Sequence, residues 1–180
     1  MAGEAGRRLP ELDEATLDFA ARVFAAARAG DAEMLGALLG LGLPANIRTA
    51  KGDSLLMLAA YHGHAGLCAV LLDHGADLEL ANDRGQTPLA AAAFRGDAAT
   101  VRLLLGRGAA VDAAGPDGRT ALMLAAMFDR AEIVEILAAH GADTARRDAG
   151  GLTAYEAAVA MGAAATPALL MRLRSQATAF

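Results

Sequence analysis

Metal binding is the first chemistry to consider, because His62, His64 and Cys68 lie close together in the sequence. Imidazole and thiolate groups are common zinc ligands, but a structural zinc site needs four ligands, and no paired Cys or His motif supplies the others. The residues 33 positions before Cys68 and 33 and 66 positions after it are all apolar: Leu35, Val101 and Val134. We therefore expect no metal here, with Cys68 in the core and His64 in a structural hydrogen bond.

Acid–base and nucleotide chemistry have no stronger basis. The carboxylates are spread along the chain without a pairing signature, and Asp77 and Asp143 each follow a Gly-Ala pair, which is typical of turns. His74 and His140 are 66 positions apart, which is twice the spacing of 33 that relates Cys68 to its apolar equivalents, and both are expected near helix ends. The glycine-rich segment 36–42 lacks the Lys-Ser/Thr pair of a phosphate loop. We expect no enzymatic activity and no cofactor.

Composition indicates a single small domain and excludes several partners. The chain has 180 residues, 55% of them hydrophobic but only 4% aromatic, so its apolar content is mostly alanine and leucine. The net charge is −5, without the basic patch that nucleic acid or an anionic membrane attracts. The single cysteine and the lack of a secretory h-region favour a cytoplasmic protein. The lack of an apolar run of about 18 residues predicts no membrane span. We expect a monomer.

A repeat of 33 positions determines the elements that place these residues. Four series of residues follow this spacing independently: Gly52, Gly85, Gly118 and Gly151; Ser54, Thr87, Thr120 and Thr153; Gly42, Gly75, Gly108 and Gly141; and Leu38, Leu71, Leu104, Leu137 and Leu170. Such a period is typical of small units that stack because none of them can bury its own apolar face.

One unit extends from Asn82 to Ala114 and shows which kind of repeat this is. It has a polar turn, Thr87-Pro88-Leu89 at the start of a small-residue helix, a turn at Gly96, an apolar second helix, and Gly108-Ala109 at its end. This pattern resembles the ankyrin repeat. The resemblance covers about Asp18 to Arg174, and the segment Lys51–Ala60 is similar to that of short bacterial members of the family.

The resemblance implies an all-α ankyrin-repeat solenoid of stacked helix-turn-helix units with N- and C-terminal capping repeats. It also implies a protein-binding scaffold and not an enzyme. The chain departs from the family where a histidine usually follows the Pro-Leu pair, and we expect apolar packing in place of that histidine's polar network. The residues at these positions are Met57, Ala90, Met123 and Glu156.

The expected domain organisation follows from the register. We expect a flexible leader at 1–12, one ankyrin-repeat domain at 13–175 and a tail at 176–180. Within the domain we expect an N-terminal cap at 13–48, three repeats at 49–81, 82–114 and 115–147, and a C-terminal cap at 148–175.

The two caps are expected to differ from the repeats between them. Asp13 and Glu14 are expected to start a long first helix, and Pro167 the last helix, with Thr166 as its cap. The inner face of the first helix is expected to consist of Leu17, Val23, Phe24, Ala26 and Ala27. The matching core positions of the C-terminal cap are expected at Tyr155, Ala158 and Val159.

The candidate binding residues are those that vary between units while their neighbours stay constant. Near the ends of the first helices these are Tyr61, His62, Phe94, Arg95, Met127 and Phe128. In the polar turns they include Lys51, Asp53, Arg84, Gln86 and Arg119. Aromatic, Met and Arg side chains are frequent in binding hot spots. We expect His62, Arg95 and Phe128 to be exposed, whereas Tyr61, Phe94 and Met127 are either a binding row or the edge of the core.

The sequence therefore predicts a non-enzymatic protein–protein interaction module that binds a partner protein through its concave face and turns, with Tyr61, Phe94, Arg95 and Phe128 as the main anchors. One alternative is an inhibitor or antitoxin-like protein, or a stress-pathway accessory regulator of one enzyme. A second alternative is a self-assembling structural protein.

Overall fold

The computed structural model describes residues 13–177, and within that range the chain forms ten α-helices and no β-structure beyond two isolated bridges. The predicted leader, residues 1–12, and the end of the predicted tail lie outside the described residues. In chain order the helices are α1 (Glu14–Ala29), α2 (Ala32–Gly40), α3 (Leu55–His62), α4 (Ala65–Asp73), α5 (Pro88–Arg95), α6 (Ala98–Gly106), α7 (Ala121–Met127), α8 (Ala131–Ala139), α9 (Ala154–Ala160) and α10 (Thr166–Ala177).

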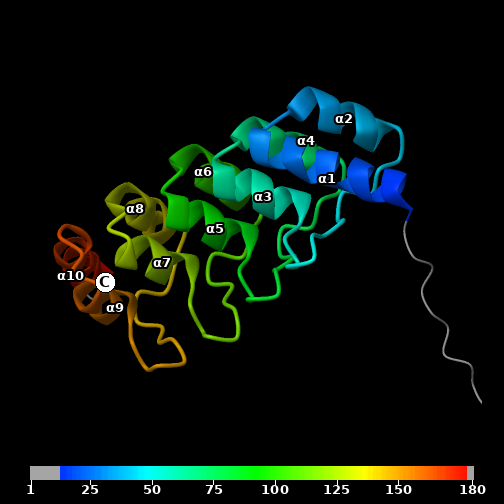
Figure 1. The fold of residues 1–180 in the computed structure, drawn as a ribbon. Helices are drawn as coiled ribbons and strands as arrows, with labels where there is room; N and C mark the ends of the chain where they lie inside the picture. The colour runs from blue at the N-terminus through cyan, green and yellow to red at the C-terminus, as the bar shows by residue number, and fades with distance from the viewer. Residues whose placement is uncertain (1–12, 178–180) are drawn as a thin grey trace, which may run out of the picture.

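The helices form two layers, which confirms the predicted all-α solenoid. The odd-numbered helices α1 to α9 contact one another in order, and the even-numbered helices α2 to α10 do the same in a second layer (Figure 1). Long loops project from the first layer on one side of the stack (Figure 1). None of the helices in residues 13–177 has the length and apolar character needed to cross a bilayer.

Hydroxyl side chains start the helices of the first layer. Ser54, Thr87, Thr120 and Thr153 each precede such a helix, and each hydroxyl accepts a hydrogen bond from the amide three residues later at 3.1 to 3.3 Å. Each cap of this kind stabilises its helix by about 1 kcal/mol. In α9 the Glu156 carboxylate also accepts the Thr153 amide at 2.8 Å and completes a capping box. The Ser/Thr series of the repeat thus marks where these helices begin.

The core consists of one apolar stripe on each helix. In the second layer, the matching residues Leu35, Cys68, Val101 and Val134 are fully buried, which confirms Cys68 as a core residue. Burial raises the pKa of the Cys68 thiol to about 12, so the thiol is neutral and inert at physiological pH. In the first layer the matching residues are small, and this lets neighbouring helices approach closely; they are Ala27, Ala60, Ala93 and Ala126, all fully buried.

The ends of the stack are less covered than the sequence predicts. Leu17 was expected on the inner face of α1, but it is 53% exposed. The reason is that α1 begins earlier in the register than α3, so that the first turns of α1 extend past the neighbour that covers the rest. Val159 was expected in the core and is 52% exposed, whereas Ala126, one repeat earlier, is buried by the next helix pair. Both predictions were wrong because of the position at the end of the stack: Leu17 lies on turns of α1 that extend past α3, and Val159 lies on a helix without a following first-layer neighbour.

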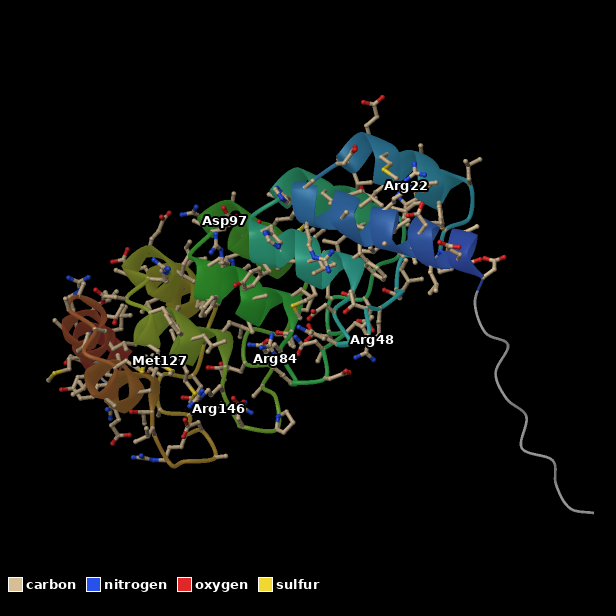
Figure 2. The ribbon with its side chains drawn as sticks, in the orientation of Figure 1. Arg22, Arg48, Arg84, Asp97, Met127 and Arg146 are labelled. Carbon is tan, nitrogen blue, oxygen red and sulfur yellow. The ribbon has the colours of Figure 1, made fainter. Side chains whose placement is uncertain are left out.

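The loops before α3, α5, α7 and α9 end in four turns, which we call tips: residues 49–53, 82–86, 115–119 and 148–152. The first and second tips are joined by the Asp83 amide, which donates to the Lys51 carbonyl at 3.2 Å. Arg48 reinforces this step by donating to the Ala81 carbonyl at 3.0 Å and to the Asp83 carboxylate at 3.2 Å (Figure 2). The third and fourth tips are joined in the same way by the Ala149 amide, which donates to the Asp117 carbonyl at 2.8 Å.

The step between the second and third tips is built differently. Pro116 occupies the position that corresponds to Asp83, and proline has no N–H to donate. Instead, the Pro116 ring lies directly over Gly85, where a Cβ atom would collide with it. Packing thus replaces the hydrogen bond at this step.

Asp129 holds the start of the last helix. It occupies the position at which other units have a turn glycine, and with φ 55° it is the only non-glycine residue of the described chain in the left-handed region. Its Oδ1 accepts hydrogen bonds from the amides of Ala165 and Thr166, both at 2.9 Å. The prediction that Thr166 caps α10 was wrong, because α10 includes Thr166 and its hydroxyl donates to the Ala126 carbonyl at 2.8 Å. The α10 N-terminus is therefore capped from the preceding unit.

Asp129→Ala is expected to loosen α10 more than Asp129→Gly, and Asp129→Asn is expected to be the mildest change. Alanine loses both hydrogen bonds and retains an unfavourable left-handed conformation, glycine removes that strain, and asparagine keeps an acceptor oxygen. Hydrogen exchange of the α10 amides measures the effect. Equal protection of α10 in Asp129→Ala and in the wild type would contradict the assignment.

The same contact predicts a pH dependence. The hydrogen bonds from Thr166 and Ala165 hold the pKa of the Asp129 carboxyl below its ordinary value. A lowered pKa in the folded state means that the ionised carboxylate stabilises folding at neutral pH, and that this is lost as the pH falls from the ordinary carboxyl range through the lowered value. Protection of α10 should therefore decrease with acidification in the wild type and much less in Asp129→Asn.

Candidate protein-binding surface

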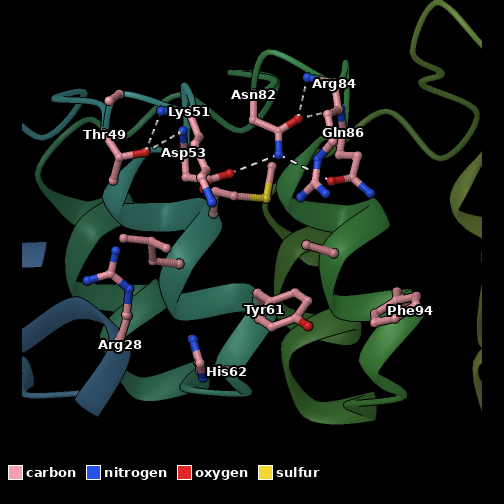
Figure 3. Close-up of a pocket in the computed structure, with 14 residues that line it drawn as sticks. Arg28, Thr49, Lys51, Asp53, Tyr61, His62, Asn82, Arg84, Gln86 and Phe94 are labelled. Carbon is pink, nitrogen blue, oxygen red and sulfur yellow. Dashed lines mark hydrogen bonds between the residues drawn. The ribbon is translucent and has the colours of Figure 1, made fainter. Parts of the chain in front are cut away.

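A cavity of about 590 Å³ lies between the first two tips and the helices of the first layer (Figure 3). The tips line one side of the cavity, and α1, α3 and α5 supply the other. Seven of the predicted binding residues line it together: Lys51, Asp53, Tyr61, His62, Arg84, Gln86 and Phe94. Residues that are distant in the sequence thus meet in one concave site.

Hydrogen bonds within and between the tips hold this side of the cavity. The Asn82 side-chain amide donates to the Asp53 carboxylate at 2.8 Å and to the Gln86 side-chain oxygen at 3.2 Å (Figure 3). The Asn82 side-chain oxygen accepts the backbone amides of Arg84 and Gln86 at 3.1 and 3.0 Å. Asp53 and Gln86, which were predicted as binding residues, are therefore also part of the network that orders the two tips.

An aromatic row extends from the cavity across three neighbouring helix pairs. The Tyr61 and Phe94 rings are stacked with centroids 6.0 Å apart, and Phe94 meets Phe128 edge to face at 4.4 Å. The Arg95 guanidinium lies 5.5 Å from the centroid of the Tyr61 ring, within the range of a cation–π contact. We call Tyr61, Phe94, Arg95 and Phe128 the aromatic row.

The aromatic row is partly exposed, and this answers the question that the sequence leaves open. Tyr61 is 39% exposed and Phe128 36%, whereas Phe94 and Met127 are half-buried. His62 and Arg95 are exposed, as expected. The row is thus both the edge of the core and an accessible surface, because each ring rests on its neighbour with one side and faces solvent with the other.

Some predicted residues lie outside this cavity, and some lining residues were missed. Met127 and Arg119 do not line it; Arg119 lies 3.8 Å from the Asp117 carboxylate and 3.7 Å from that of Asp148. Arg28, Thr49 and Asn82 line the cavity but were not predicted. A signal for Arg28 is present in the register, since it occupies the position 33 residues before Tyr61.

The two histidines at the end of α3 have separate roles. The His64 ring nitrogen Nε2 lies 2.9 Å from the Arg28 carbonyl, which confirms the predicted structural hydrogen bond. Burial, followed by the positive charges of His64, Arg95 and Arg28, holds the pKa of the His62 imidazole below its ordinary value. The described residues contain no group of three or more His, Cys, Asp or Glu side chains suited to hold a metal ion.

The remaining residues considered for chemistry stabilise helix ends and turns. In both His74 and His140, Nδ1 lies 2.8 Å from the carbonyl four residues earlier, Val70 and Ile136 respectively. The Asp77 and Asp143 carboxylates each accept the amide two residues later, at 2.9 and 2.8 Å, as predicted for turn residues. These side chains are fully accounted for by local structure.

Comparison with known proteins agrees with this architecture. The family model for ankyrin repeats (3 copies) matches residues 23–115 and 91–177, which together cover most of the chain. The chain belongs to the ankyrin repeat family. Ankyrin repeats are in general protein–protein interaction modules, and the concave side of the ankyrin stack is where this chain places its cavity and its aromatic row.

A more detailed similarity is confined to part of the chain. Over 53 residues the sequence is 55% identical to an ankyrin repeat protein of Pseudomonas aeruginosa. That match covers 29% of this chain and 31% of the relative, so the chain matches about a third of the relative's length.

Proposed function

We propose that this ankyrin repeat protein binds a partner protein through the cavity between its first two tips and through the aromatic row, without catalysing a reaction. The observation that carries the proposal is the row itself: three rings and a guanidinium in mutual contact, partly open to solvent, beside a concave cavity. Aromatic and arginine side chains grouped at the centre of an interface are the residues that contribute most to binding free energy.

The surface is suited to binding because it is already ordered. The rings lie at the ends of helices whose inner residues are buried, and the Asn82 network fixes the first two tips. A partner therefore meets side chains and loops that lose little conformational entropy on association. The mechanism is complementarity to a rigid surface.

Replacing Arg95 and Phe128 together by alanine is expected to weaken partner binding by about 2 kcal/mol or more, because both are of the hot-spot type. Folding is expected to change little, since both side chains are exposed. The partner is captured from a lysate of the source organism with the wild-type protein, and its affinity for both proteins is then measured by calorimetry.

The control is Arg102→Ala with Met171→Ala on the second layer, which removes one arginine and one large apolar side chain, both exposed and outside the cavity. This control should bind as the wild type does. Undiminished affinity in Arg95→Ala/Phe128→Ala, with the thermal unfolding midpoint unchanged, would remove the aromatic row from the interface. The expected cytoplasmic location and monomeric state stay predictions, and regulation of one enzyme and a self-assembling structural role stay alternatives.

A further inference from the structure

The charge of the cavity is opposite to the charge of the chain. The net charge of the protein is −5, yet the cavity is lined by the cationic side chains of Arg28, Lys51 and Arg84. Asp53 is the only carboxylate among its lining residues, and its Oδ1 already accepts the Asn82 amide at 2.8 Å. Positive charge is therefore concentrated at this one concave site.

The cations of the cavity form no ion pair with a carboxylate of residues 13–177, which is also true of the exposed Arg22, Arg95, Arg130 and Arg146. Elsewhere in residues 13–177, six arginines lie 2.9 to 3.8 Å from a carboxylate: Arg48, Arg102, Arg107, Arg119, Arg147 and Arg172. The charges of Arg28, Lys51 and Arg84 are therefore available to an anion from another molecule.

His62 also lines the cavity and lies near one of its cations, Arg28. Burial lowers the pKa of this imidazole, and the positive charges of His64, Arg95 and Arg28 lower it further. A histidine that is disfavoured in its cationic form by its neighbours indicates a positive local potential. An anion in the cavity would relieve that potential.

The cavity also has an apolar floor between fixed tips. Met57, Leu58 and Ala91 line its base, next to the Tyr61 and Phe94 rings. The Lys51 amide donates to the Thr49 hydroxyl at 3.3 Å and the Arg84 amide to the Asn82 side-chain oxygen at 3.1 Å, so the backbone that carries both cations is held in place. Its volume of about 590 Å³ falls within the size range of ordinary ligand sites.

We propose that this cavity binds an acidic segment of the partner protein, in which carboxylates flank one large apolar side chain. The carboxylates pair with Lys51, Arg84 and Arg28, and the apolar side chain rests on the floor beside Tyr61. This inference rests on the proposed function and adds the chemistry of the partner to it.

A peptide fits this charge distribution better than a nucleic acid does. Three cations share one cavity, and the rest of the protein is net negative, so a long polyanion meets net repulsion outside the site. A short acidic segment that alternates with apolar residues needs only the local charge. The partner is therefore recognised by a few carboxylates and one apolar anchor.

Selection from a random peptide display library on the immobilised full-length protein tests the proposal. The expected pool is enriched in sequences with two or more Asp or Glu residues around a Leu, Phe or Tyr. A fluorescent peptide made from the most enriched sequence is then titrated with the protein, and its affinity is expected to decrease with increasing salt.

The variant that tests the site is Lys51→Glu with Arg84→Glu, which should weaken binding of this peptide by about tenfold or more, since like charges then face each other. Its matched control is Arg22→Glu with Arg146→Glu, which changes the net charge equally at two exposed arginines outside the cavity (Figure 2). The control should retain the wild-type affinity to within about twofold, as expected for distant, screened charges. Circular dichroism checks that both variants fold.

The outcomes separate this inference from the proposed function. Selected peptides that lose affinity in Arg95→Ala/Phe128→Ala but have no acidic excess would retain the binding surface and overturn the acidic partner. Equal peptide affinity for Lys51→Glu/Arg84→Glu and for the control variant would also overturn the acidic partner. A library that yields no peptide sensitive to any of these concave variants would overturn both proposals. Single-stranded DNA is added as a competitor. If it bound tightly and displaced the selected peptides, the cavity would be assigned to nucleic acid instead.

Discussion

Replacing Leu104 by alanine is expected to lower the free energy of unfolding by about 3–5 kcal/mol. Leu104 is fully buried in α6, and its equivalents in the neighbouring pairs, Leu71 and Leu137, are fully buried too. In a stacked architecture each pair is stabilised by both neighbours, so a cavity in a central pair weakens two interfaces at once. Chemical denaturation followed by circular dichroism measures the loss.

The control for this substitution is Leu41→Ala, because Leu41 is 86% exposed beyond the end of α2. Its expected effect is within about 0.5 kcal/mol, as for ordinary surface positions. If Leu104→Ala lost less than about 1 kcal/mol, the central stripe would not carry the stability assigned to it.

Gly85→Ala is expected to destabilise the protein by about 2–5 kcal/mol, for two separate reasons. Gly85 has φ 75°, a left-handed conformation that costs an alanine about 1–2 kcal/mol. Its new Cβ would also meet the Pro116 ring and lie 2.8 Å from the Gly115 Cα atom, so the third tip would have to move. Overpacking of this kind costs about 1–3 kcal/mol more.

Gly108→Ala separates the two reasons. Gly108 has φ 93°, but no atom lies within 4 Å of an added Cβ, so only the conformational cost of about 1–2 kcal/mol applies. Denaturation curves of the two variants give the difference directly. Equal losses at Gly85 and Gly108 would show that the contact between the second and third tips contributes nothing.

Most of the fold is predictable from the sequence because the repeat is visible there. The Ser/Thr series predicted where helices of the first layer begin, and the Leu series predicted the stripe of the second layer. The same register gave Cys68 its place in the core. The contact between Tyr61 and Phe94 was predictable as well, since residues 33 apart lie on adjacent helices. Phe128 lies one position beyond that register, which Met127 occupies, so its contact with Phe94 does not follow from the spacing.

What the register cannot predict is how residues at different positions of the repeat meet. Asp129 has no counterpart in the other units, and its bonds to the α10 amides join residues more than one repeat apart. The register relates Arg28 to Tyr61, but it does not predict that Arg28 lines one cavity with the tip residues Lys51 and Arg84. Exposure of Leu17 and Val159 depends on how many neighbours a helix has, which no local pattern expresses.

The glycine series shows the same limit. The sequence shows Gly52, Gly85 and Gly118 as one series of the repeat, and a positive φ at each position is a sufficient reason for glycine there. The structure adds a second reason, because an atom added to any of the three would strike the following tip. That contact is a property of stacked units and is invisible in one unit alone.

Pro116 divides the row of tips into two pairs, each of which is joined by a backbone hydrogen bond. An arginine adds a further link within each pair. At the middle step Ala81 and Pro116 occupy the positions that Arg48 and Asp83 have at the first step, so the backbone hydrogen bond and the Arg48 link are both missing there. A hydrogen bond of this kind contributes about 0.5–1.5 kcal/mol. The cavity lies on one side of this step and Phe128 on the other. A partner that contacts both the cavity and Phe128 would therefore bridge the one step between tips of residues 13–177 that has no backbone hydrogen bond.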